Sequence, residues 1–299
     1  MRSLKALFAL VVVGPLCTQN ATAQAKLGKQ GAEGEPNRKQ QWLVPSPDAG
    51  TVAHAVLFRP PGDGPFPLAL IAHASTQNVL RRAQMPQPEY PALAAWLVAR
   101  GFAVLVPERP GHGATGGKYL EDQGGCDEAD FSRAGRATAD EIAAALNFIR
   151  GQSFIRQDGA VVLGHSAGGW GALALARENP QGVGAIIAFA AGRGGHANDF
   201  PDRVCAPHTL LSSSAEFGQH ARVPVTWLVA ANDTYFSPAL SKQLADAFRG
   251  GGDRVDFHVL AASGSEGHWL AETEAGIKIA GPQLDRALKA LAARPDKRR

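Results

Sequence analysis

From Trp42 onward, short apolar runs alternate with amphipathic segments, and this alternation limits the possible folds more than any other feature of the chain. The pattern predicts a mostly parallel sheet with helices on both faces, because parallel strands need helical crossovers and are covered on both sides. One domain, residues 41–299, accounts for the whole pattern. The predicted strands are 42–44, 52–58, 68–72, 102–106, 160–163, 183–189, 223–229 and 255–260, and the predicted helices are 91–100, about 142–149, 168–178, 237–248 and about 282–293.

The first 40 residues lie outside this pattern. Arg2 and Lys5 precede the apolar run Ala6–Val13, and small residues at Ala21–Ala23 or at Ala23–Ala25 offer a cleavage site. A run this short between such flanks is typical of an export signal, so we predict a signal peptide over residues 1–25 and a periplasmic or secreted protein. Residues 26–40 are rich in glycine and charge and lack an apolar period, which predicts a flexible leader.

Charge and hydropathy narrow the class of partner. The chain has 30 Lys and Arg against 27 Asp and Glu, so its net charge is close to zero. Nucleic-acid binding favours a concentrated basic face, which argues against such a partner. After the predicted signal, no apolar run approaches the roughly 20 residues of a membrane span. We therefore expect a small-molecule substrate, no nucleic acid and no membrane span.

The segment Gly164–Gly168 reads Gly-His-Ser-Ala-Gly and lies where an apolar run gives way to a predicted helix. A serine on so sharp a strand-to-helix turn is strained, and its hydroxyl projects above the sheet. The small residues on either side make room for this turn. We predict that Ser166 is a nucleophile, with a plain glycine-rich turn as the alternative interpretation.

A serine hydroxyl is a poor nucleophile at neutral pH, so it needs a base, and the base needs an acceptor that orients it. Asp233 follows the predicted strand 223–229, and His268 follows the last predicted strand. The order Ser, Asp, His is typical of a nucleophile on this kind of turn. Asp233 also belongs to an Asn-Asp turn dipeptide, and Glu266 is a second acid close to His268.

The intermediate of acyl transfer carries an oxyanion that needs hydrogen-bond donors. The backbone N–H of Ala167, directly after the predicted nucleophile, is the first candidate. The second is Ser75, in the loop after the predicted strand 68–72. The nearby His73 fits a role in fixing that loop better than a direct role in catalysis.

At this point a family resemblance is evident. From about Trp42 to the last helix the chain resembles α/β-hydrolases of the dienelactone-hydrolase and prolyl-oligopeptidase-like branch. The resemblance implies an α/β-hydrolase fold with a mostly parallel eight-stranded sheet and a Ser-Asp-His triad. Ser166 stands where dienelactone hydrolases proper carry cysteine. The segments that carry the resemblance are Gly164–Gly168, Ala231–Asp233, Gly267-His268 and Arg109–Gly113.

The expected function is hydrolysis of small or medium carboxylic esters through an acyl-enzyme on Ser166. A peptidase or amidase with the same triad is the first alternative, because fold does not fix substrate. A secreted binding protein of the same fold without activity is the second. The sequence has no metal-binding or phosphate-binding motif, so we expect neither metal nor cofactor.

Two cysteines, Cys126 and Cys205, remain after the predicted signal. Both follow predicted strands of the sheet, and an exported protein meets an oxidising environment. A disulfide between them is therefore expected, with two free thiols as the alternative.

Overall fold

The computed structural model describes residues 26–250 and 255–293, and its centre is one mixed sheet. Its strand order is β1-β2-β3-β5-β4-β6-β7-β8-β9, in which the strands from β5 to β9 are parallel and β1, β2 and β3 join antiparallel at one edge. The predicted mostly parallel sheet is thus confirmed. The strands are β1 Gly28–Gly34, β2 Lys39–Pro45, β3 Val52–Phe58, β4 Leu68–Ala72, β5 Ala103–Pro107, β6 Ala160–His165, β7 Val183–Phe189, β8 Val225–Ala230 and β9 Val255–Leu260.

Residues 26–40 differ from the predicted flexible leader, and the sheet has a ninth strand in place of the expected eight. Strand β1 pairs antiparallel with β2, where Gly28 lies opposite Leu43 and Lys29 opposite Trp42. Its side chains are almost all exposed, so the strand carries no apolar period. Backbone hydrogen bonds to β2 hold it, and a hydrophobic pattern does not reveal such an edge strand. The predicted signal, residues 1–25, lies outside the described residues.

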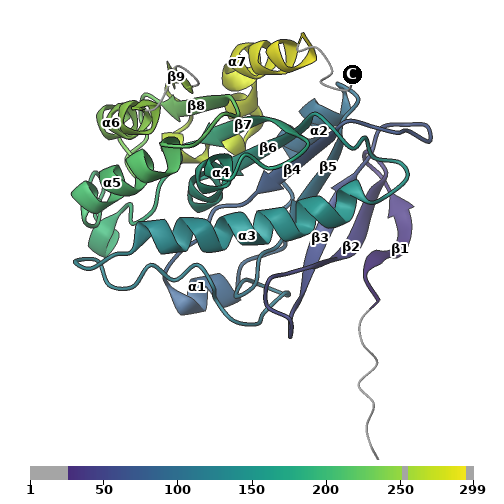
Figure 1. The fold of residues 1–299 in the computed structure, drawn as a ribbon, viewed down its shortest axis with the longest axis horizontal. Coiled ribbons are helices and arrows are strands. Elements are labelled where there is room, and N and C mark those ends of the chain that lie inside the picture. Colours follow the sequence, from purple (N-terminus) through teal and green to yellow (C-terminus); the bar gives the residue numbers. More distant parts are fainter. Residues whose placement is uncertain (1–25, 251–254, 294–299) are drawn as a thin grey trace, which may run out of the picture.

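Helices cover both faces of the sheet, as the alternation predicted (Figure 1). Alternate residues of β4 belong to different layers: Leu70 packs in the cluster that contains Ile142 of α3, and Ile71 in the one that contains Leu93 of α2. Successive side chains of a strand point to opposite faces of the sheet, so a central strand is buried on both faces. The helices are α1 Val79–Ala83, α2 Pro91–Val98, α3 Phe131–Arg150, α4 Ala167–Arg177, α5 Pro207–Gly218, α6 Pro238–Arg249 and α7 Glu274–Ala292, with short 3-10 turns η1 Ala197–Asp199 and η2 Gly267–Ala271.

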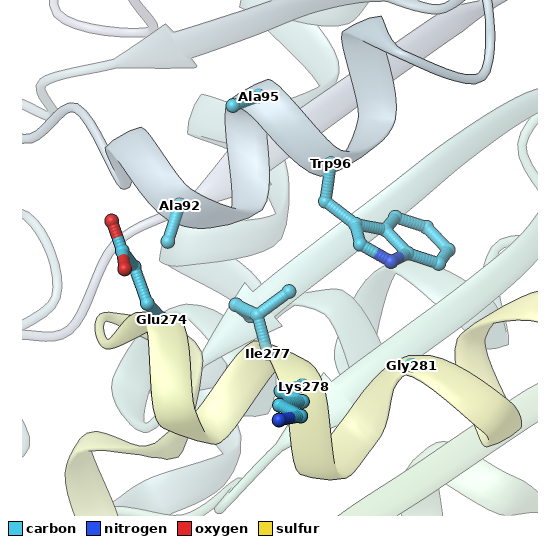
Figure 2. A pocket seen from close by; sticks show the side chains of 7 residues that line it. All are labelled: Ala92, Ala95, Trp96, Glu274, Ile277, Lys278 and Gly281. Atoms are coloured by element: carbon cyan, nitrogen blue, oxygen red, sulfur yellow. The ribbon is translucent and has the colours of Figure 1, made fainter.

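A groove of about 510 Å³ lies between α2 and α7. Figure 2 shows that Ile277 of α7 points toward α2, between Ala92 and Trp96. None of the predicted site residues lines this groove. Among the described residues, the helices include none that is both long and apolar enough to cross a membrane.

Candidate active site

Ser166 connects β6 to α4 in a backbone conformation that few residues other than glycine adopt, with φ 54° and ψ −119°. Its backbone N–H donates to the carbonyl of Phe189 at 2.9 Å, which fixes the turn against β7. A Cβ on Gly164 would lie 2.4 Å from the carbonyl oxygen of Gly168, and one on Gly168 would lie 2.2 Å from that of Ala72. The two glycines are therefore needed for the close approach of backbone on both sides of the serine.

Asp233 and His268 meet at the carboxyl ends of β8 and β9, as the sequence predicted. The carboxylate oxygen Oδ2 of Asp233 lies 3.2 Å from Nδ1 of His268, and both side chains are buried. The second oxygen, Oδ1, accepts the backbone N–H groups of Tyr235 and Phe236, each at 2.9 Å. Asp233 is thus held in place by its own turn and presents one oxygen to the histidine ring.

Burial lowers the pKa of His268, and the hydrogen bond to Asp233 opposes that shift. The ring is therefore neutral near pH 7. A neutral imidazole whose Nδ1–H is bound to a carboxylate has Nε2 free to accept a proton.

Glu266 makes contacts different from those of a triad acid. Its carboxylate accepts the backbone N–H of His268 at 2.9 Å and that of Thr234 at 3.1 Å, and the Thr234 hydroxyl also donates to it. Burial acts to raise the pKa of Glu266, but these donors outweigh it and the pKa is lowered. Glu266 therefore ties the loop after β9 to the loop after β8, and Asp233 is the acid at the ring.

His165, the last residue of β6, connects this strand to the loop after β9 that holds His268. Its Nε2 lies 2.8 Å from the backbone carbonyl of His268, and its Nδ1 lies 3.0 Å from the hydroxyl of Tyr90. The main chain of His268 is thereby bound to the residue next to Ser166. Within the described ranges, no hydrogen bond joins the Ser166 hydroxyl to the ring of His268, a contact that in ligand-free enzymes often tightens only when substrate binds.

The predicted oxyanion donors lie on two segments that touch. Ala167 begins α4, and Gly168 packs against the carbonyl groups of Ala72 and His73 at the end of β4. In the loop after β4, the backbone N–H of Ala74 donates to the Tyr90 hydroxyl at 3.1 Å. That amide is thus already used, which leaves the amide of Ser75 as the candidate on this loop.

Two buried histidines hold the Ser75 loop. His73 accepts the backbone N–H of Arg109 at Nε2, 3.0 Å away, and its Nδ1 lies 2.6 Å from the carbonyl of Ala74. His112 lies 2.8 Å from the Ser75 hydroxyl through Nε2, and burial lowers the pKa of His112 to about 4. Both rings are neutral near pH 7 and act as fixed hydrogen-bonding groups, in agreement with the structural role expected for His73.

Sequence reasoning did not identify a buried cluster of charges behind this loop. Arg109 donates to the carbonyl of His73 at 2.8 Å and to Glu121 at 2.5 Å, and Arg193 also donates to Glu121. Burial opposes ionisation of Glu121, but Arg109 and Arg193 hold its pKa well below the usual range. Burial and the charge of Glu121 raise the pKa of Glu141 well above its usual range. Of the two acids, Glu121 is thus the one whose ionised form the arginines stabilise, while Glu141 favours its protonated form.

The structure joins Cys126 and Cys205 in a disulfide, with their Cα atoms 4.8 Å apart. The bond links the loop between β5 and α3 to the loop between β7 and α5, and both loops start at the carboxyl edge of the sheet. Among residues 26–250 and 255–293, no group of three or more His, Cys, Asp or Glu side chains is arranged to hold a metal ion.

Comparison with known proteins supports the fold. Residues 87–216 match a family model described as serine aminopeptidase, S33, and no curated protein matches the sequence. An esterase from Pyrococcus furiosus is 11% identical to this chain and superposes on it with a TM-score of 0.60. The match covers 84% of this chain and 92% of the esterase chain. A Butyrivibrio proteoclasticus protein solved with ferulic acid is 15% identical with a TM-score of 0.59, and the match covers 84% of this chain and 99% of that protein. A Klebsiella pneumoniae protein assigned to the dienelactone hydrolases is 17% identical with a TM-score of 0.54, and the match covers 86% of this chain and 100% of that protein. The chain therefore has the α/β-hydrolase fold.

Proposed function

We propose that this protein is a serine hydrolase that cleaves small or medium carboxylic esters, with Ser166 as nucleophile, His268 as base and Asp233 as the acid that orients the base. The observation that carries the proposal is the hydrogen bond between Asp233 and His268, together with the bond from the main chain of His268 to His165, the residue directly before Ser166. The name of the Pyrococcus furiosus neighbour, an esterase, supports the choice of ester as substrate.

In the proposed mechanism, Nε2 of His268 takes the proton of the Ser166 hydroxyl as its oxygen attacks the ester carbonyl. The imidazolium then gives that proton to the leaving alcohol, which leaves an acyl group on Ser166. Water attacks the acyl-enzyme with His268 again as base, and the acid product leaves. Asp233 keeps the proton of Nδ1 in place and stabilises the imidazolium.

The backbone amides of Ala167 and Ser75 are the proposed donors to the oxyanion. The amide of Ala167 is at the first turn of α4, where backbone N–H groups have no partner within the helix. The buried guanidinium of Arg109 supports this assignment, because it donates to the carbonyl of His73 behind the Ser75 loop and its positive charge favours a developing negative charge there.

A fluorophosphonate probe tests the mechanism directly. The purified protein is expected to be labelled at Ser166, while Ser166→Ala is expected to fold, resist labelling and lose esterase turnover by several orders of magnitude. Absence of labelling of the wild-type protein would favour the alternative of a non-catalytic binding protein. Comparable ester hydrolysis by Ser166→Ala would exclude the assigned nucleophile.

A peptidase or amidase with the same triad is the second candidate, and the name of the matching family model favours it. Hydrolysis of p-nitrophenyl acetate measured against a panel of aminoacyl-anilides separates the two. We expect kcat/KM to be higher on the ester.

We also propose that residues 1–25 are a removed signal peptide and that the protein works in the periplasm or outside the cell as a single hydrolase domain. The disulfide between Cys126 and Cys205 supports this location, because such bonds persist in oxidising compartments. N-terminal sequencing of the protein recovered from the periplasm tests it.

A further inference from the structure

Two aromatic rings, Tyr235 and then His196, are stacked on one face of the proposed base. The rings of Tyr235 and His268 are 4.2 Å apart between centroids and inclined by 20°, and His196 lies on Tyr235 at 3.5 Å and 12°. The other rings that touch His268 meet it at steeper angles, 80° for Trp269, 52° for Phe236 and 48° for His165. Of these four neighbours, Tyr235 alone lies nearly parallel to the His268 ring.

The position of Tyr235 is fixed by the same carboxylate that orients the base. Oδ1 of Asp233 accepts the backbone N–H of Tyr235 at 2.9 Å, while Oδ2 lies 3.2 Å from Nδ1 of His268. Both rings are thus set relative to one buried group. Their stacking is a consequence of the turn after β8 and requires no ordering when substrate binds.

His196 is held on the outer side of Tyr235. Its Nε2 lies 2.8 Å from the hydroxyl oxygen of Thr234, and that hydroxyl donates its proton to Glu266. Since the hydroxyl proton is already used, Nε2 of His196 must be the donor to Thr234. Thr234, in the loop after β8, therefore fixes the outer ring, which belongs to the loop after β7.

Ester hydrolysis places a positive charge on the ring of His268, which is only 2% exposed. Burial makes such a charge unfavourable, and the face of an aromatic ring attracts a cation. We propose that Tyr235 is a positioning residue whose ring face stabilises the positively charged form of His268 during turnover, with His196 holding the tyrosine ring in place. This inference rests on the proposed function, because it requires His268 to be the base.

Other charged and titratable groups also act on His268. Asp233 and Glu266 favour its charged form, and a positive charge on His165, at the end of β6, would oppose it. The carboxylate of Glu272 lies 3.1 Å from Nδ1 of His165. These groups remain unchanged in any variant of position 235, so a difference between variants reports the ring itself.

Loss of the ring is expected to change two features of the pH profile, the midpoint of its acid limb and the height of its plateau. Without it, protonation of His268 is less favourable, so the acid limb of kcat/KM moves to lower pH. The plateau falls at the same time, because the imidazolium of the transition state is less stable. For Tyr235→Leu we expect the plateau of kcat/KM to fall by roughly two- to fivefold. We expect the midpoint of the acid limb to shift by about half a unit to lower pH. A variant that is merely loosened would lose rate without this shift.

A fluorinated series at position 235 removes the risk that Tyr235→Leu fails to fold. With Tyr235→Phe as the reference, 4-fluoro-, 3,5-difluoro- and 3,4,5-trifluorophenylalanine keep the ring's shape and progressively weaken its negative face. The plateau of kcat/KM on p-nitrophenyl acetate is measured for each protein. The pKa of His268 is measured by NMR for the same substitutions in a Ser166→Ala background, so that it does not depend on activity.

The outcomes separate this inference from the proposed function. A plateau and a His268 pKa that both fall along the fluorinated series support the role of Tyr235. If neither changes along the series, the proposal is overturned. A pKa that falls while the rate and its acid limb stay constant would mean that the ring acts on His268 but that His268 is not the base, which would overturn the proposed mechanism as well.

Discussion

The carboxylate of Glu266 accepts the backbone N–H of His268 at 2.9 Å, although only Gly267 separates the two residues. The ring of the same histidine points to Asp233, on the neighbouring strand end. The backbone and the ring of His268 are thus held by two different acids. This arrangement gives the two carboxylates separate roles that mutation can distinguish.

Asp233→Asn is expected to lower kcat/KM on p-nitrophenyl acetate by about 10⁴-fold, because the amide favours the wrong tautomer of His268. Glu266→Gln is the matched control. Its amide oxygen can still accept an N–H from the loop, so we expect a loss below about tenfold and a small decrease in Tm. If the glutamine variant were the one nearly inactive, the assignment of the acid would be wrong.

The acid limb of kcat/KM is expected to have its midpoint below the ordinary histidine value of about 6.5. Burial, the largest cause, lowers the pKa of His268, so the neutral base persists to lower pH than in a free imidazole. The same shift affects stability. Unfolded His268 binds a proton more readily, so its contribution to stability is complete above about pH 6.5 and is lost as the pH falls through the folded pKa. A midpoint above 7 in the rate profile would contradict burial as the dominant cause.

The strand ends that hold Ser166 and Asp233 were predictable because each follows a strongly apolar run, and parallel strands bring their carboxyl ends to one edge. The run before His268 is weaker, since β9 contains Asp256 and His258, but it has the length and the β-branched residues of a strand. Helix α5, Pro207–Gly218, was not predicted. Two of the residues on its buried face are Ser213 and Ser214, and the Ser214 hydroxyl donates to the carbonyl of Leu244. A buried face that contains hydroxyls has no clear apolar period, although it packs in the core.

Helix α7 shows a similar limit at its start. We expected it near Pro282, because proline favours the first turn of a helix, but it begins at Glu274 with Thr273 as its cap.

Hydrophobic periodicity also does not reveal charges that meet in the core. Glu121 and Arg193 are separated by 72 positions in the sequence, and each taken alone has the pattern of a surface residue. Only the packing of two loops brings them together.

The buried charge cluster offers a matched pair of variants. Glu121 is the ionised acid between two arginines, so Glu121→Gln leaves excess positive charge in the core, and we expect a loss of about 3–5 kcal/mol in the free energy of unfolding. Glu141 lies in the same cluster, with Oε2 3.3 Å from Nε of Arg109, but burial and the charge of Glu121 raise its pKa well above the usual range and favour its protonated form. Glu141→Gln is therefore expected to change stability by less than about 1 kcal/mol. Urea denaturation of both variants tests this, and equal losses would contradict the assignment of charge.

The disulfide between Cys126 and Cys205 should stabilise the fold and the rim of the site together. Its sequence separation is 79, and loop entropy predicts a contribution of about 4 kcal/mol before native-state strain is counted. We expect Tm to fall on reduction with dithiothreitol, and esterase activity to be lost at a lower temperature than in the oxidised protein, because the bond joins the loop of Glu121 to the loop of Arg193. The double variant Cys126→Ala, Cys205→Ala is the control, since its Tm must match that of the reduced protein and must not respond to the reductant. A wild-type Tm that is the same with and without reductant, in protein whose thiols are shown by alkylation to be free after treatment, would show that the bond contributes nothing to stability.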